Sequence, residues 1–286
     1  MYVMDPYDDA LERILKEGVW KTNRTGVRTI AKFGIQSRYR IDQAFPMTTR
    51  RKLWPKAVFG ELTTFVSGRT RNADFIANGC KFWTPWVDEE WAAARGFVPD
   101  SFGKVYGFNL RHFGGEFGNG DPDSPEYGRG GFDQLAYMMD RLKNKPDDRR
   151  ILFSLWNPAE LDNMKLPPCH YTFQCFVDDG MLSGMLTQRS CDFPVGVPAN
   201  IQFYSAFIYM LAQQCGYEPY EFVHSTVDSH IYEDQIPAVE EYLSRPKPDS
   251  PQLQLNKADD IESYKTEDFK IVNYNPLPPI EIPVAV

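Results

Sequence analysis

The stretch ANIQFYSAFIYMLAQQC (199–215) is the feature that most constrains the fold of this chain, because it is apolar on nearly every side. A helix of this kind has no polar face to turn toward water, so other elements have to enclose it. A chain of 286 residues, 42% of them hydrophobic, is large enough to do so. We therefore expect a buried central helix inside one substantial core.

The segments around this stretch mix strands with helices. HYTFQCFVDDG (170–180) and MLSGMLTQRS (181–190) predict two strands joined by a hairpin-type turn at DDG. There is no regular βαβ alternation, and no change in composition marks a domain boundary. The sequence therefore predicts one α+β domain over residues 1–286, with a mixed β-sheet and a Gly-, Pro- and Asp-rich surface insertion at 114–131. The other predicted elements are helices at 5–17, 56–68 and 132–144 and strands at 28–41 and 149–156.

The balance of charges limits the classes of partner. A formal net charge of −8 argues against a general nucleic-acid binder, which would carry a basic face. It does not exclude a small anionic substrate, because a few arginines converging on one pocket can hold a phosphate. No run approaches the roughly 18 apolar residues of a membrane span, and the N-terminal MYVMDPYDDALERILKEG lacks the basic and apolar regions of a signal peptide. We expect a cytoplasmic protein that binds neither nucleic acid nor membrane.

Residues 165–177, KLPPCHYTFQCFV, place a cysteine and a histidine side by side after two prolines. Cys169 could be a buried structural thiol, a zinc ligand, half of a disulfide or a nucleophile. The five cysteines are an odd number, widely spread and without a CxxC pair, which argues against a disulfide framework and against a metal site. His170 is a poor candidate for the direct base of a nucleophile, because neighbours in a strand point to opposite faces. These residues alone leave a structural thiol and a nucleophile both open.

Three polar clusters accompany Cys169, and each by itself has an ordinary structural explanation. QRSCD (188–192) combines a cation with hydrogen-bonding groups, as a phosphate clamp does, but it could equally be a solvated strand end. DRR (148–150) places two arginines after a turn, most often just surface charge. DSHIY (228–232) sets His230 and Tyr232 on one face of a strand, where they could hold a hydroxyl together.

Together these fragments resemble the thymidylate synthase family, and the resemblance runs from end to end of the chain. LPPCH, QRSCD and the C-terminal tail are highly specific in combination. The matching motifs, in family order, are NRTG (23–26), GELTTFVSG (60–68), FWTPW (82–86), VYG (105–107), DDRR (147–150), LPPCH (166–170), QRSCD (188–192), GVPANI (196–201), DSHIY (228–232) and PVAV (283–286).

The family places a one-carbon unit on C5 of the uracil in dUMP, using 5,10-methylenetetrahydrofolate and no metal. The resemblance implies that Cys169 adds to C6 of the ring, a task that suits a thiolate because it is nucleophilic near neutral pH and leaves again. It also implies an obligate homodimer formed through the sheet, in which Arg149 and Arg150 reach into the partner subunit's site. The implied phosphate ligands are Arg24, Arg149, Arg150, Arg189 and Ser190.

The resemblance also assigns base recognition and proton transfer. Asn200 matches the uracil-reading position, where a carboxamide can donate to O4 and accept from N3–H; this favours dUMP over dCMP. Glu61, which alone would be read as an ordinary helix-surface acid, matches the carboxyl that moves protons through ordered water. The other implied residues are His230 and Tyr232 for the ribose 3′-hydroxyl, Gln188 for the substrate, Tyr106 and Asp228 for the proton network, His170 for water near O4, and Trp83, Trp86, Leu166, Asp192, Gly196 and Val286 for the folate.

Several residues depart from the family pattern around this pocket. Ala199 replaces the usual aromatic before Asn200, Thr63 stands for a bulky residue, Leu110 for a tryptophan, and HSTVD (224–228) lacks a glycine pair. A looser pocket could admit water to the methylene intermediate and favour a pyrimidine nucleotide 5-hydroxymethylase, which releases tetrahydrofolate. Trp83 and the PVAV tail favour a dry site and therefore the synthase. The preference among dUMP, UMP and dCMP remains open.

Two further classes have to be weighed. A catalytically dead dimer could bind nucleotide or a partner protein, but the presence of Cys169, Glu61 and Asn200 argues against it. A thiol hydrolase would need an independent His–Asn/Asp partner set, and none is evident in the sequence.

Overall fold

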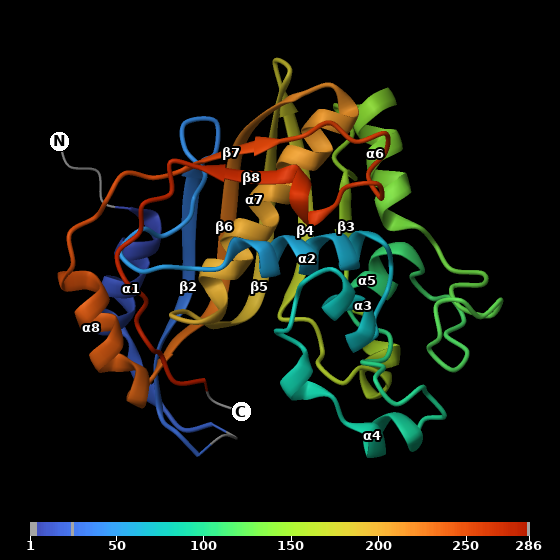
Figure 1. Cartoon of the computed structure of the whole chain (residues 1–286), viewed down its shortest axis with the longest axis horizontal. Coiled ribbons are helices and arrows are strands. Elements are labelled where there is room, and N and C mark those ends of the chain that lie inside the picture. The colour runs from blue at the N-terminus through green and yellow to red at the C-terminus, as the bar shows by residue number, and fades with distance from the viewer. Residues whose placement is uncertain (1–4, 24–25, 285–286) are drawn as a thin grey trace.

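The apolar stretch forms a 20-residue helix, α7 (Gly196–Cys215), which crosses the middle of the computed structural model (Figure 1). The structure describes residues 5–23 and 26–284. Most of α7 is buried, and the helix ends at Gly216, whose left-handed φ of 81° suits glycine. The predicted buried central helix is confirmed, and it begins three residues earlier than expected.

A six-stranded mixed sheet lies behind α7, and its strand order is β1-β2-β6-β5-β4-β3. Strands β5 and β6 run parallel, joined through α7, whereas all other neighbours are antiparallel. The predicted hairpin is confirmed, with Asp179 and Gly180 both at positive φ in its two-residue turn. The strands are β1 (Val19–Lys21), β2 (Thr29–Arg40), β3 (Leu152–Ser154), β4 (His170–Asp178), β5 (Met181–Asp192) and β6 (Glu218–Tyr232).

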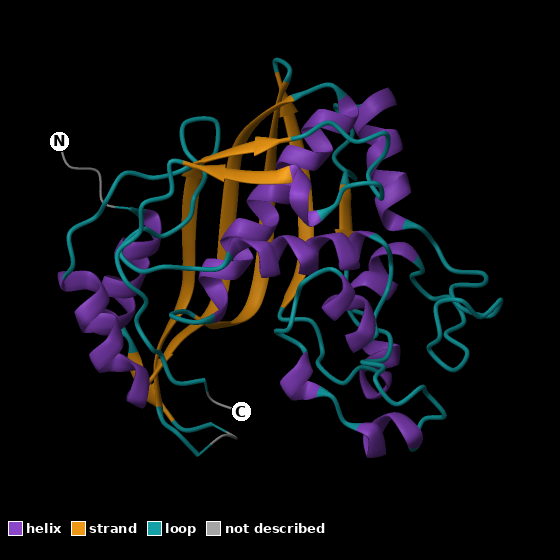
Figure 2. Cartoon of the chain, in the orientation of Figure 1, coloured by secondary structure: helices purple, strands orange, loops and turns teal. Residues whose placement is uncertain are grey.

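Helices cover one face of this sheet: α7 packs against β5 and β6, and α2 (Pro55–Val66) packs in turn against α7 (Figure 2). The opposite face carries exposed side chains that include Arg38 of β2, Phe176 of β4 and Met185 of β5, and these line a shallow hollow that β6 also borders. The remaining elements are α1 (Pro6–Glu17), α3 (Asn72–Ala77), η1 (Thr84–Trp86), α4 (Glu89–Ala93), α5 (Tyr106–Arg111), α6 (Gln134–Asn144), η2 (Pro158–Asn163), η3 (Glu233–Gln235), α8 (Ile236–Ser244), β7 (Gln252–Leu255), η4 (Thr266–Asp268) and β8 (Phe269–Val272).

Two strand predictions differ from the structure. The strand expected over 149–156 is only Leu152–Ser154, because Arg149 and Arg150 belong to the preceding turn, where Asp148 accepts the Arg150 backbone N–H at 3.0 Å. Strand β6 is 15 residues long, although only its last five were recognised as strand-like. Its first half lies between β2 and β5, so backbone pairing on both sides stabilises a polar sequence that does not look like a strand.

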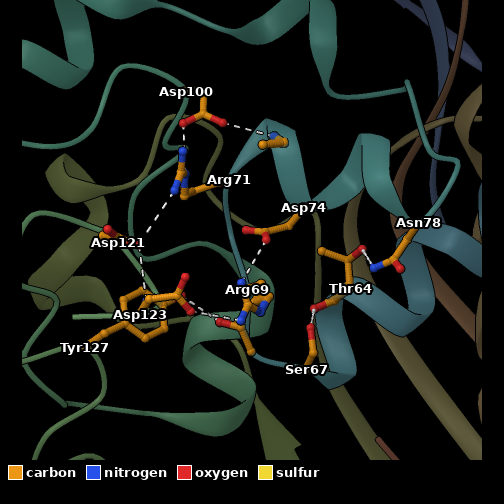
Figure 3. Close-up of polar contacts among 12 residues, drawn as sticks. Thr64, Ser67, Arg69, Arg71, Asp74, Asn78, Asp100, Asp121, Asp123 and Tyr127 are labelled. Carbon is orange, nitrogen blue, oxygen red and sulfur yellow. Dashed lines mark hydrogen bonds and ion pairs between the residues drawn. The ribbon is translucent and has the colours of Figure 1, made fainter. Parts of the chain in front are cut away.

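The segment 114–131 forms no helix or strand, but several side chains hold it against α2 and α3 (Figure 3). Arg69 lies between Asp74 of α3 and Asp123 of the segment, at 3.0 and 3.2 Å. Arg71 likewise pairs with Asp100 and Asp121. The Tyr127 hydroxyl donates to the Gly68 carbonyl at 2.7 Å.

We expect Tyr127→Phe to destabilise the protein by about 1 kcal/mol, because it removes a partly buried hydrogen bond while keeping the ring. Urea unfolding measures the loss. Tyr137→Phe is the control, because within the described chain the Tyr137 hydroxyl makes no hydrogen bond. Equal unfolding midpoints for both variants would contradict a fastening role for Tyr127.

No helix within residues 5–23 and 26–284 is long and apolar enough to cross a membrane. In the same residues, no group of three or more His, Cys, Asp or Glu side chains is arranged to hold a metal ion.

Candidate active site

Cys169 directly precedes β4, at the end of the sheet where β5 carries Arg189. The Arg189 Nη2 atom lies 3.8 Å from the Cys169 sulfur, and the Arg189 backbone N–H donates to the Cys169 carbonyl at 2.8 Å. The same guanidinium donates to the carbonyls of Pro167 and Pro168, both at 2.9 Å. The carbonyls of the two prolines thus hold the Arg189 guanidinium in one position. A cation held this close to the Cys169 sulfur favours the thiolate form.

The aromatic rings of Tyr106 and His170 pack together next to Cys169. The Tyr106 hydroxyl accepts the Cys169 backbone N–H at 2.9 Å, and the Tyr106 and His170 ring centroids are 4.5 Å apart. His170 Nδ1 is 2.7 Å from the Tyr204 hydroxyl rather than directed at the sulfur. Burial and, to a smaller extent, the nearby His224 lower the pKa of His170 to about 3, so His170 is neutral at physiological pH.

Glu61 is buried on α2, and the indole N–H of Trp83 donates to its Oε1 at 2.7 Å. Burial raises the pKa of Glu61 to about 7, against the lowering effect of this hydrogen bond. Such a carboxyl can both give and take a proton near neutral pH. Trp83 is itself buried, with its ring stacked on Phe75 at 5.0 Å, so one indole face is already covered.

Gln188 links Asn200 to His224 through a buried chain of hydrogen bonds. Gln188 Nε2 donates to Asn200 Oδ1 at 3.1 Å, and Gln188 Oε1 lies 2.9 Å from His224 Nε2. Because the Gln188 oxygen can only accept, His224 donates from Nε2. Asn200 lies near the start of α7, and its buried neighbours Gln188 and His224 therefore determine the orientation of its amide.

Ser190, Asp228, His230 and Tyr232 line a pocket of about 220 Å³, whereas Cys169, Arg189 and Asn200 are not among its lining residues. Asp228 accepts from Lys21 Nζ at 2.6 Å and from His230 Nδ1 at 3.1 Å. Burial alone would raise the pKa of Asp228, but these two hydrogen bonds outweigh it and lower the pKa. With Nδ1 occupied by Asp228, His230 keeps Nε2 for a ligand.

Asp192 ends β5 next to the start of α7. Burial raises the pKa of its carboxyl, while hydrogen bonds from Gln235 Nε2, 3.2 Å from each oxygen, oppose the rise. Gly196 is the first residue of α7, and Leu166 and Trp86 are partly buried hydrophobic residues packed against the core.

Two predicted phosphate ligands, Arg149 and Arg150, are not assembled with Cys169 in the described part of one chain. Arg149 and Arg150 are exposed in the α6–β3 turn, where Arg150 pairs with Asp148 at 2.9 Å. The Arg149 carbonyl accepts from Gln174, five residues along β4 from Cys169, roughly 16 Å at about 3.3 Å per residue. Arg24 and Val286 lie outside the described residues.

A family model described as thymidylate synthase matches residues 5–286. The chain belongs to the thymidylate synthase family. The thymidylate synthase of Corynebacterium aurimucosum is 40% identical over 98% of this chain and 97% of the relative. That of human herpesvirus 8 is 40% identical over 96% of this chain and 82% of the relative. The bifunctional dihydrofolate reductase-thymidylate synthase of Zea mays is 40% identical over 98% of the chain, which spans only 54% of that relative's length.

Membership of the thymidylate synthase family confirms the resemblance drawn from the motifs. Motif matching nevertheless missed residues that contact the predicted site residues. Lys21 binds Asp228, His224 binds Gln188, and Gln235 binds Asp192. In the sequence, Lys21 lies close to the NRTG motif and His224 lies close to the DSHIY motif, and this proximity is the one signal that could have pointed to them. Nothing in the sequence points to Gln235.

Proposed function

We propose that this thymidylate synthase family protein transfers a one-carbon unit to C5 of dUMP, giving dTMP and dihydrofolate. The observation that carries the proposal is the contact between the Cys169 sulfur and the guanidinium of Arg189, 3.8 Å apart; the next residue along β5, Ser190, lines a pocket. This contact combines a thiol favoured as thiolate with neighbouring groups that suit an anionic nucleotide.

Cys169 adds through its sulfur to C6 of the uracil, forming an S–C6 bond and moving the ring electrons toward O4. C5 becomes nucleophilic as a result, and the same S–C6 bond breaks at the end of the reaction. Methylenetetrahydrofolate supplies the one-carbon unit and, for methylation, the hydride. Arg189 and Ser190 hold the 5′-phosphate, which fixes C6 relative to the sulfur.

Glu61 moves the protons of the reaction. The C5 proton has to leave and charge on O4 has to be relieved, and a buried carboxyl with a pKa of about 7 can serve both steps through water. Trp83 supports this role because its indole N–H fixes the Glu61 carboxyl in one orientation.

Asn200 reads the base and His230 with Tyr232 reads the sugar. The uracil edge offers an acceptor at O4 and a donor at N3, which one carboxamide can satisfy together. Gln188 and His224 support this reading by holding the Asn200 side chain. His230 Nε2 and the Tyr232 hydroxyl project from alternate positions of β6, on one face, toward a ribose 3′-hydroxyl.

The residues near Asp192 fit a folate. The partly buried carboxylate of Asp192 can accept hydrogen bonds from a pterin ring, while Leu166 and Trp86 offer apolar surface. Val286 is assigned to the tail that covers the folate, as the family motif indicates.

The complete site needs a second copy of the chain. Arg149 and Arg150 lie in the α6–β3 turn beside Gln174, too far from Cys169 to share a site within one subunit. Both arginines are exposed and therefore accessible to a partner subunit. The uncovered sheet face, with Phe176 and Met185 exposed, supports a homodimer packed sheet to sheet. Each subunit would give its two arginines to the other subunit's phosphate site.

A mixing experiment tests the shared site. Cys169→Ala and the double variant Arg149→Ala/Arg150→Ala should each be inactive alone. Unfolded together and refolded, they should regain about a quarter of wild-type activity, because half of the dimers are mixed and each contains one intact site. Activity from the arginine variant alone, or none from the mixture, would contradict the exchange.

Hydroxymethylation is the second candidate, favoured by the small side chain of Ala199, which is partly buried against the core next to Asn200. Product mass after incubation with dUMP and methylenetetrahydrofolate separates the two reactions. A methylated nucleotide with equimolar dihydrofolate supports the synthase, and a hydroxymethylated nucleotide with tetrahydrofolate supports the alternative. No product from dUMP contradicts both and directs the assay to dCMP and UMP.

A further inference from the structure

Gln235 is a fully buried side chain in η3, the turn that joins β6 to α8. Its Oε1 accepts the backbone N–H of Tyr232 at 3.0 Å. Its Nε2 donates to both carboxylate oxygens of Asp192, at 3.2 Å each, and to the carbonyl of Pro283 at 2.9 Å. One amide therefore joins the ribose-reading strand, the acid assigned to the folate and the C-terminal tail.

The orientation of this amide is determined by its neighbours. A backbone N–H can only donate, so the Gln235 oxygen has to face Tyr232. The nitrogen then faces Asp192 and Pro283, which can only accept, and its two hydrogens serve these two acceptors. Every polar atom of the buried amide is satisfied, so a different rotamer would cost hydrogen bonds.

The tail makes few hydrogen bonds, and the buried Ile280 and the partly buried Ile282 also pack it against the core. Leu277 donates its N–H to the Thr49 carbonyl at 2.9 Å, and Arg245 donates to the Pro278 carbonyl at 2.6 Å. Beyond Pro278, the bond from Gln235 to Pro283 is the one hydrogen bond found among the described residues. The red C-terminal segment in Figure 1 has no helix or strand here, and Pro283 and Val284 are exposed.

We propose that Gln235 is a positioning residue that holds the C-terminal tail against Asp192 and so couples tail closure to folate binding. The inference rests on the proposed function for the role of Asp192. When the tail detaches from Gln235, the Gln235 amide is free to move. Asp192 then loses the hydrogen-bond donor that keeps its carboxylate in place.

Two substitutions separate the contacts. Gln235→Met keeps the length and removes both donated bonds together with the bond accepted from Tyr232, while Gln235→Glu keeps the acceptor for Tyr232 and places a second carboxyl against Asp192. The matched control is Gln214→Met, because Gln214 also uses Nε2 to hold a loop, through the Ala258 carbonyl at 3.0 Å, but on the C-terminal end of α7.

The first readout is the rate at which carboxypeptidase removes residues from the C-terminus of the ligand-free protein, followed by intact mass. We expect Gln235→Met to lose them at least about fivefold faster than wild type, as for one lost hydrogen bond, and Gln214→Met to match wild type. The second readout is the KM for methylenetetrahydrofolate at pH 8, expected to rise roughly tenfold in both Gln235 variants, with the KM for dUMP unchanged in Gln235→Glu, which keeps the bond from Tyr232.

The glutamate variant gives a signature that general loosening does not. Below pH 5 the introduced carboxyl is protonated and can donate, so tail release should be slow; at pH 8 it repels Asp192, so release should be fast. His230 and Asp234, the other charged or titratable groups that act on Asp192, are common to all the variants and cancel in the comparison with wild type.

Equal release from Gln235→Met and wild type would overturn the proposal. Faster release with an unchanged KM for the folate would overturn the coupling. If the wild type turns over no folate, the proposed function fails instead, and the release rates of the ligand-free variants still decide whether Gln235 holds the tail.

Discussion

Cys169→Ser is expected to lower turnover of dUMP by about 10⁴-fold or more, because an alcohol at this position is not ionised near neutral pH and cannot add to C6 at a useful rate. The fold should not change, since Cys169 is only partly buried and forms no disulfide. The measurement is kcat with saturating dUMP and methylenetetrahydrofolate, with thermal unfolding recorded for each protein.

Cys215→Ser is the matched control, because Cys215 is also partly buried and outside any disulfide but lies at the far end of α7. It should retain wild-type kcat. Substantial turnover by Cys169→Ser, or equal loss in both variants, would contradict the assignment of Cys169 as the nucleophile.

Glu61→Gln is expected to lower kcat by roughly 10²- to 10⁴-fold, because the amide cannot exchange protons with C5 or O4. The carboxyl should also give wild-type kcat an ionisation near pH 7, where its pKa lies. The measurement is a pH–rate profile of both proteins, and an ionisation near pH 7 that persists in the variant would assign it to another group.

The same substitution should stabilise the folded protein at alkaline pH. Burial raises the pKa of Glu61 from its ordinary 4.5 to about 7, so the folded state holds a proton that the unfolded state has released between these values. Stability is then full below pH 4.5 and falls as the pH rises toward 7, by about 3 kcal/mol in total. Urea unfolding should show the variant close to wild type at pH 4.5 and more stable at pH 8. A variant less stable at pH 8 would contradict burial as the cause.

The parts of the fold that follow from the sequence are those in which local pattern and tertiary environment agree. The apolar stretch 199–215 had to be enclosed by other elements, and the corresponding helix α7 is buried. The DDG sequence suits a two-residue hairpin turn, and the chain forms one between β4 and β5. Strand β6 was mostly missed because its first ten residues, EPYEFVHSTV, include proline and several polar residues. Its conformation is determined by pairing with β2 and β5, which are distant in the sequence.

The candidate site divides in a similar way. The family resemblance pointed to Cys169 and Arg189, and the pairing of β4 with β5 brings them together at adjoining strand ends. Gln235 stayed hidden because its contacts with Asp192 and Pro283 join residues 43 and 48 positions apart. Trp83, which the resemblance assigns to the folate, also donates its indole N–H to Glu61, a contact that the motifs do not indicate.

The most direct test of the account is the intact mass of the protein after incubation with 5-fluoro-dUMP and methylenetetrahydrofolate, followed by peptide mapping. Fluorine cannot leave C5 as the proton does, so the reaction should stop with the nucleotide still bound to sulfur. The account predicts a mass increase equal to both ligands, carried by the peptide containing Cys169 and absent from Cys169→Ser. No adduct, or an adduct at Cys80, Cys175, Cys191 or Cys215, would contradict covalent one-carbon transfer through Cys169.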